Sequence, residues 1–216
     1  MDITWHGHSC FRLRGRDVSV VTDPYDRTTG YPTLRLTADV VTVSHDHPHH
    51  SFVEAVQSAD RRPRRVDGPG EYEIGGVMIN GVATFRDKQK GSLHGKNTAY
   101  LFSFDDLSVC HLGDLGHTLT AEQIDALKDA NVLLVPVGGE CTIDAVEAVE
   151  VVSQLEPKLV IPMHYGTPKV PLGSVDRFCR ELGVADLPVS QRLSATRSSL
   201  PEETQVLLLA PPEPRR

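Results

Sequence analysis

The sequence predicts one layered α/β domain over residues 1–210, followed by a flexible tail over 211–216. Up to about residue 112, short apolar runs alternate with glycine-rich turns, which is typical of β-meanders. From Thr120 onward, strand and helix patterns alternate, as they do in βαβ units. No linker or repeat separates the two parts, and 216 residues with 39% hydrophobic side chains suit a single core.

The first part of the chain consists mainly of expected strands. They share alternating or β-branched apolar patterns and cover residues 2–13, 17–22, 40–44, 66–85, 98–104 and 107–112. Gly7 predicts a kink that divides the first of these stretches into two strands. We expect a loop over 25–38, a short helix over 51–58 and a surface loop over 88–96.

The second part of the chain predicts helices with recognisable ends. Thr120 and Gln123 match a capping box that opens a helix to about Ala130. Thr142 is expected to cap a helix that ends near Leu155. The remaining elements are strands at 132–137, 158–163 and 205–210, and a helix at 174–182 closed by a glycine.

Composition narrows the class of protein. The net charge of −7 argues against a general attraction to nucleic acid, although residues 61–65 form a basic cluster that we interpret as a solvated turn. No apolar run approaches the roughly 20 residues of a membrane span, and the N-terminal residues do not resemble a signal peptide. The four cysteines are widely spaced, which fits a reducing cytoplasm. The sequence gives no indication of oligomeric state.

A histidine cluster follows the β-branched strand at 40–44. It consists of His45, His47, His49 and His50, and Pro48 favours extended backbone at His47. Imidazole is the commonest metal ligand, so a turn that gathers four of them predicts a metal site. The alternative is a solvated histidine-rich turn.

Three other expected strands also end at a possible ligand. Asp23, Asp114 and His164 follow the strands at 17–22, 107–112 and 158–163. The carboxyl ends of strands are where loops converge into sites in α/β sheets. Alternatively, Asp114 forms a turn between glycines and His164 is a core histidine, but four such strand ends together favour a shared site.

The motifs resemble the metallo-β-lactamase fold superfamily, and within it small bacterial metal-dependent hydrolases related to ascorbate-6-phosphate lactonase. The matching pieces, in family order over residues 1 to about 166, are WHGHSCF, TDP, SHDHPHH, GKNT, HLGDLGH, VPVGG and IPMHY. The resemblance implies an αββα sandwich with a metal site along one edge of two facing sheets. It also implies that His45 and His47 bind one metal, that His50 and His164 bind another, and that Asp114 bridges them.

Two departures from the family pattern concern the metals. His49 stands where the family has an Asp, and Arg86 lies in the segment where relatives have a third His for the first metal. A fixed positive charge about 4 Å from a cation raises the energy by roughly 4 kcal/mol at an effective dielectric near 20. We therefore expect one firmly held metal, on His49, His50, Asp114 and His164, and a weak or empty His45/His47 position. His94 could swing in to complete it.

The resemblance and the ligand set together predict a metal-dependent hydrolase that directs a metal-bound hydroxide at a small ester, lactone or phosphoester. We expect zinc, with manganese, iron or nickel as alternatives. Asp114 would hold the nucleophile and Asp23 would orient a ligand imidazole. An anionic small-molecule substrate would meet His8, Arg86, Lys96 and Asn97, and Cys141 is expected to be inert. The alternatives are a degenerate metal- or metabolite-binding protein and a nuclease or phosphodiesterase.

Overall fold

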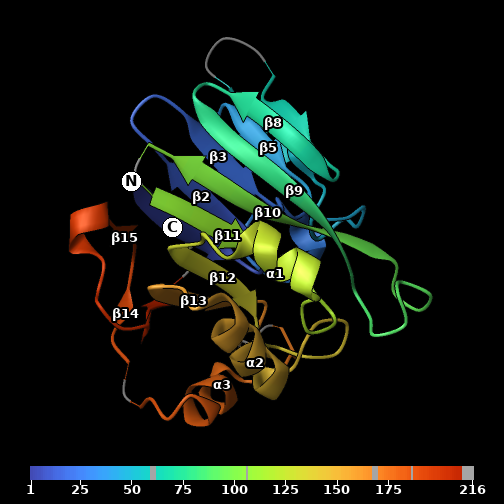
Figure 1. Cartoon of the computed structure of the whole chain (residues 1–216). Coiled ribbons are helices and arrows are strands. Elements are labelled where there is room, and N and C mark those ends of the chain that lie inside the picture. Colours follow the sequence, from blue (N-terminus) through green and yellow to red (C-terminus); the bar gives the residue numbers. More distant parts are fainter. Residues whose placement is uncertain (59–61, 106, 167–169, 186, 211–216) are drawn as a thin grey trace.

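The structure is a computed structural model that describes residues 1–58, 62–105, 107–166, 170–185 and 187–210. Two β-sheets pack face to face in it (Figure 1). The first sheet has the strand order β15-β1-β2-β3-β5-β7. Its strands are β1 Asp2–Gly7, β2 Cys10–Arg14, β3 Ser19–Thr22, β5 Val40–Thr42, β7 Arg64–Val66 and β15 Leu193–Ser194.

The second sheet has seven strands in the order β16-β13-β12-β11-β10-β9-β8. They are β8 Gly70–Ile74, β9 Val77–Phe85, β10 Lys96–Phe104, β11 Leu107–His111, β12 Val132–Pro136, β13 Leu159–Met163 and β16 Gln205–Val206. Two further strand pairs lie outside the main sheets: β4 Leu36–Thr37 with β6 Val56–Gln57, and β14 Val189–Ser190 with β17 Leu208–Leu209.

The main core lies between the two sheets. Trp5 and Phe11 from the first sheet share one buried cluster with Tyr100 and Phe102 from the second. All four side chains are at most 1% exposed. Burying a large apolar side chain contributes roughly 1.5–3 kcal/mol, so this layer holds the sheets in a fixed relation. The sandwich expected from the family resemblance is confirmed.

The outer faces of the two sheets are covered differently. Helices α1 Ala121–Leu127, α2 Ala145–Leu155 and α3 Val175–Glu181 pack on the outer face of the second sheet (Figure 1). Over the first sheet, the described residues form irregular chain with two 3₁₀ turns, η1 Arg27–Thr29 and η2 Val53–Ala55. Tyr25 and Leu34 from this segment pack against the sheet.

Three local expectations are corrected by the structure. The helix expected over 51–58 is the 3₁₀ turn η2 followed by β6, because Val56 pairs with β4 in an extended conformation. The cap of α2 is Asp144 and not Thr142, since the Asp144 carboxylate accepts hydrogen bonds from the N–H groups of Val146 and Glu147. The strand expected over 205–210 is divided into β16 and β17, and the tail over 211–216 lies outside the described residues.

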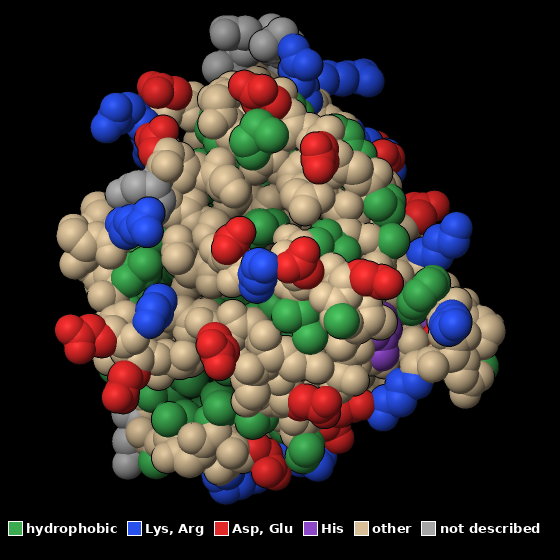
Figure 2. Space-filling view, in the orientation of Figure 1, with side chains coloured by type: hydrophobic (Ala, Val, Ile, Leu, Met, Phe, Trp, Pro, Cys, Tyr) green, Lys and Arg blue, Asp and Glu red, His purple; other side chains and the backbone are tan. Residues whose placement is uncertain are grey.

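The surface in Figure 2 shows acidic and basic side chains interspersed over one face, so the described residues there form no continuous basic patch. Among the helices of the described residues, none has the length and apolar character that a membrane crossing requires.

Candidate metal centre

The parallel strand ends bring the predicted residues together at one edge of the sandwich. Asp23 follows β3 and the histidine loop follows β5, and these two strands are parallel neighbours in the first sheet. Asp114 follows β11 and His164 follows β13, which flank β12 in a parallel array in the second sheet. Because parallel strands end at the same edge, all four loops face one another.

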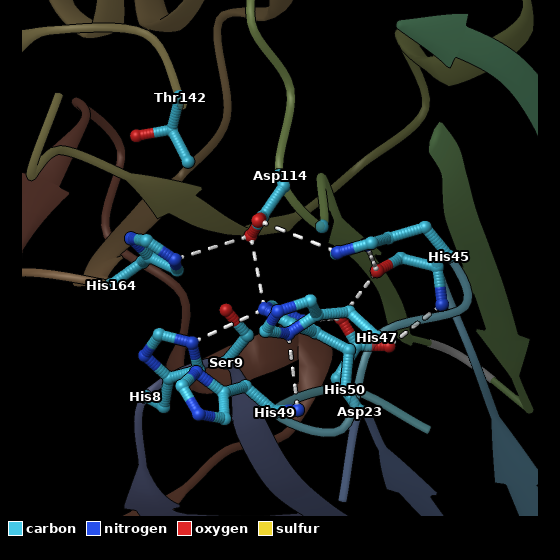
Figure 3. A network of polar contacts seen from close by, with 12 residues as sticks. His8, Ser9, Asp23, His45, His47, His49, His50, Asp114, Thr142 and His164 are labelled. Carbon is cyan, nitrogen blue, oxygen red and sulfur yellow. Dashed lines mark hydrogen bonds and ion pairs between the residues drawn. The ribbon is translucent and has the colours of Figure 1, made fainter. Parts of the chain in front are cut away.

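One oxygen of Asp114 is surrounded by imidazoles. Asp114 Oδ1 lies 3.4 Å from His50 Nε2 and 3.4 Å from His164 Nε2. His8 comes from the turn between β1 and β2, and its Nε2 lies 3.1 Å from His50 Nε2. In Figure 3, dashed lines connect His164 and His50 to Asp114, and His50 to His8. The Oδ1 side of the carboxylate therefore faces two ring nitrogens, and His8 lies next to one of them.

The other oxygen of Asp114 faces a guanidinium. Arg86 Nη2 lies 3.1 Å from Asp114 Oδ2, and Arg86 Nη1 donates to the carbonyl of His94. His45 Nε2 is 3.7 Å from the same oxygen, and Cys141 Sγ is 3.9 Å from it. The Arg86 charge thus occupies the side of Asp114 where the family resemblance implies a second metal.

A second layer of hydrogen bonds fixes the inner residues. Asp23 Oδ2 pairs with His50 Nδ1 at 2.9 Å, and its two oxygens accept from the backbone and hydroxyl of Ser44. Since Ser44 uses Asp23 as an acceptor, His50 donates through Nδ1 and turns the lone pair of its Nε2 toward Asp114. Asn97 Oδ1 accepts from the backbone N–H of Asp114 at 3.0 Å.

The backbone is strained at three of these residues. His8, Asp23 and His164 have φ angles of 53°, 40° and 51°, in the left-handed region that side chains other than glycine rarely adopt. Such conformations persist where the surrounding structure imposes them, and they concentrate at functional sites. Gly138 allows one of them, because a Cβ built at Gly138 would lie 2.1 Å from the carbonyl oxygen of His164.

The protonation states suit a cation. Burial lowers the pKa of His45 and of His50 to about 3, and burial also lowers the pKa of His8 well below its usual value. Burial raises the pKa of Asp114, but the imidazoles of His50 and His164 hold it well below its usual value overall. A deprotonated imidazole and an ionised carboxylate are the forms in which these side chains bind metals.

The donor set fits a metal ion. Asp114 Oδ1 and His45 Nε2 are buried and have no hydrogen-bond partner among the described residues. Within the described residues, His8, His50 and His164 form one group whose donor atoms all lie within 4.8 Å of one another. His45, His50 and Asp114 form a second such group. Tetrahedral ligands at zinc distances lie about 3.3 Å apart. This is close to the 3.4 Å from Asp114 Oδ1 to His50 and to His164, and to the 3.1 Å between the Nε2 atoms of His8 and His50.

Some of the predicted residues are not brought into the cluster. His49 Nε2 pairs with Thr28 Oγ1 at 2.9 Å, and His47 Nδ1 accepts from the backbone N–H of His49. Neither histidine belongs to a donor group of the described residues. His94 and Lys96 are exposed, and His94 meets Arg86 through its carbonyl.

Asn97 differs from its expected role in substrate binding. It is buried, and its amide nitrogen donates to Thr84 Oγ1 and to the carbonyl of Leu112. With its oxygen on Asp114, the amide is fully used within the protein. Asn97 therefore positions the backbone of Asp114 and has no donor free for a substrate.

Two side chains without an expected role lie at the site. Ser44, at the end of the strand expected over 40–44, bonds Asp23, and Cys141, which we expect to be inert, lies 3.9 Å from Asp114 Oδ2. The TDP and SHDH motifs place Asp23 and Ser44 at neighbouring strand ends, which could have indicated their pairing. No sequence signal connects Cys141 with Asp114, because the loop between β12 and α2 brings them together.

The loop that carries Arg86 is organised around one carboxylate. Asp87 accepts hydrogen bonds from four backbone N–H groups, those of Gln89, Gly91, Leu93 and His94. These bonds, that of His94 first, lower the pKa of Asp87 to about 2. Because His94 supplies the carbonyl that accepts from Arg86, Asp87 indirectly fixes the guanidinium over Asp114.

A beta-lactamase superfamily domain model matches residues 2–164, which include every residue of the cluster around Asp114. The chain belongs to the metallo-β-lactamase superfamily. Among the solved structures of the superfamily, a candidate Zn-dependent hydrolase from Thermotoga maritima is 39% identical, with a TM-score of 0.79, and the match covers 96% of this chain and 97% of that one.

More distant proteins are similar to the chain as well. A metal-dependent hydrolase from Thermoplasma volcanium is 29% identical over 191 residues, which are 76% of this chain and 83% of that protein. An isothiocyanate hydrolase from Delia radicum gut bacteria has a TM-score of 0.69 at 14% identity, and the match covers 99% of this chain and 97% of that one. At that identity, the likeness concerns the fold alone.

Proposed function

We propose that this metallo-β-lactamase superfamily protein is a metal-dependent hydrolase of a small ester, lactone or phosphoester. The observation that carries the proposal is the buried Asp114 carboxylate, with two imidazoles on its Oδ1 side and the Arg86 guanidinium on its Oδ2 side. The superfamily membership and the metal-dependent hydrolases among the relatives support the reaction class. We favour zinc because the donors are mainly imidazoles with one carboxylate.

A bound zinc ion supplies Lewis acidity that makes water reactive near neutral pH. Asp114 Oδ2 would accept the proton of an attacking water and hold it in line for the substrate. Arg86 would contact the oxygen on which negative charge develops, because its guanidinium is charged and already fixed at this side of Asp114. The half-buried Arg86 also favours an anionic substrate.

The test is hydrolysis of generic esters, lactones and phosphodiesters by the zinc- and manganese-loaded protein. Asp114→Ala is expected to lose at least about 100-fold in kcat/KM, the usual contribution of a positioned proton acceptor. The control is Asp125→Ala, which removes an exposed helix carboxylate that pairs only with Lys128 among its described partners. Equal activity in wild type and Asp114→Ala contradicts the proposal.

A second candidate is a metal-binding member of the superfamily without turnover. The ion pair between Arg86 and Asp114 favours it, because a neutralised carboxylate is a weaker proton acceptor. A metal-loaded wild-type protein that hydrolyses none of the three substrate classes supports this candidate and contradicts the first.

A further inference from the structure

His49, which was expected as a metal ligand, makes its hydrogen bond outside the cluster around Asp114. His49 Nε2 pairs with Thr28 Oγ1, and Thr28 is in turn tied to Asp26 Oδ1 by its hydroxyl and its backbone N–H. Since Asp26 caps the η1 turn through these bonds, His49 is part of a surface network. Any metal on the Oδ1 side of Asp114 needs another donor.

His8 lies where that donor is needed. The residue is only 6% exposed, and its ring lies tilted against the rings of His164 and His50, at centroid distances of 4.2 Å and 4.8 Å. Its Nε2 faces His50 Nε2 at 3.1 Å. His50 already donates through Nδ1 to Asp23, so its Nε2 carries a lone pair that faces His8. A cation between the two nitrogens satisfies both.

The backbone holds His8 in this position. The carbonyl of His8 accepts from Trp5 Nε1 at 2.9 Å and from the backbone N–H of His164 at 3.2 Å. The second bond joins His8 directly to another residue of the cluster, across the gap between the two sheets. The left-handed conformation at His8, with φ of 53°, is therefore fixed from both sides.

We propose that His8 is a metal ligand, which replaces the carboxylate of the family motif and completes a site of His8, His50, His164 and Asp114 for one divalent cation. The inference deepens the proposed function and rests on the same metal site. Three imidazoles and one carboxylate leave a zinc ion with a formal charge of +1, and donors from both sheets make the ion a cross-link between them.

The test compares His8→Ala with His49→Ala by zinc titration of the metal-free proteins and by X-ray absorption of the zinc-loaded proteins. Loss of one orienting partner behind a ligand already weakens metal binding by about 10–100-fold, so His8→Ala is expected to lose at least that much. The imidazole count at zinc should fall from three to two. His49→Ala should keep the wild-type affinity and spectrum.

His8→Gln guards against a folding defect, because it preserves most of the buried volume. Its metal-free form should match the metal-free wild type in circular dichroism while zinc binding is weakened. Wild-type zinc affinity in both His8 variants, or loss of binding in His49→Ala, overturns the inference. Zinc binding through His8 in a protein that hydrolyses no substrate contradicts the proposed function alone, so the two failures are distinguishable.

Discussion

At the residue scale, Asp114 divides the site into two faces. The sequence predicted Asp114, His50 and His164 correctly as neighbours, because each follows a strand that ends at the same edge. His8 was expected at the site as a substrate contact, but its direct approach to His50 could not be predicted, since the two residues are 42 positions apart and meet only through the packing of two loops. The contact between Arg86 and Asp114 could not be predicted either, because a long side chain can reach several places from one backbone position.

The Arg86 guanidinium predicts the number of metals. Arg86→His removes the fixed charge from Asp114 Oδ2 and adds an imidazole beside His45, so a second equivalent of zinc is expected to bind. Metal content after dialysis measures it. Arg86→Gln is the matched control, which removes the charge without a strong ligand and should retain one equivalent. One equivalent in Arg86→His contradicts this reasoning.

Asp23 is expected to act through His50. Asp23→Asn weakens the hydrogen bond to His50 Nδ1, and zinc affinity should fall by about 10–100-fold. Asp39→Asn is a close control, since Asp39 also accepts from the backbone and hydroxyl of one serine, Ser19, but its known partners lie outside the cluster. Isothermal titration measures the zinc affinity of both variants. An equal loss of affinity in both would contradict a specific role of Asp23 behind His50.

At the element scale, local sequence signals work best for helices whose first residues carry a capping motif. The capping box of Thr120 and Gln123 opens α1 as predicted, whereas α2 is capped by Asp144 in place of the predicted Thr142. The expectation for 51–58 was wrong because an isolated apolar pattern cannot reveal that Val56 has a strand partner in β4. Tertiary pairing decided that segment, and with it the path of the chain after the histidine loop.

The loop over 86–95 should be sensitive to acid through Asp87. Its folded pKa of about 2 lies below the ordinary 3.8, so its ionised form stabilises the fold above about pH 4, and this contribution is lost as the pH falls toward 2. Melting temperatures of wild type and Asp87→Asn should therefore differ at pH 6 and converge near pH 2. A constant difference across this range argues against a charge-dependent loop.

The connection between β12 and α2 packs so closely against His164 that position 138 has no room for a side chain. Gly138→Ala places a methyl group against the His164 carbonyl, and we expect a loss of about 1–3 kcal/mol in the free energy of unfolding together with weaker zinc binding. Gly68→Ala is the control, because a Cβ there has nothing within 4 Å. Urea denaturation compares the two variants, and equal midpoints would contradict the close packing.

At the scale of the whole molecule, the site joins the two sheets. His8 and His50 belong to loops of the first sheet, and Asp114 and His164 belong to loops of the second. The layered architecture was predicted from the meander and βα patterns, because these patterns indicate which segments of each half form strands and which form helices. How the two halves face each other depends on the core around Trp5 and Phe102, which sequence periodicity does not encode.

The most direct measurement is anomalous scattering at the zinc edge from crystals of the zinc-loaded protein. The account predicts one peak per chain, at about 2 Å from His8 Nε2, His50 Nε2, His164 Nε2 and Asp114 Oδ1. Two peaks on opposite sides of Asp114, or a single peak on the side of His45 and Arg86, would contradict it.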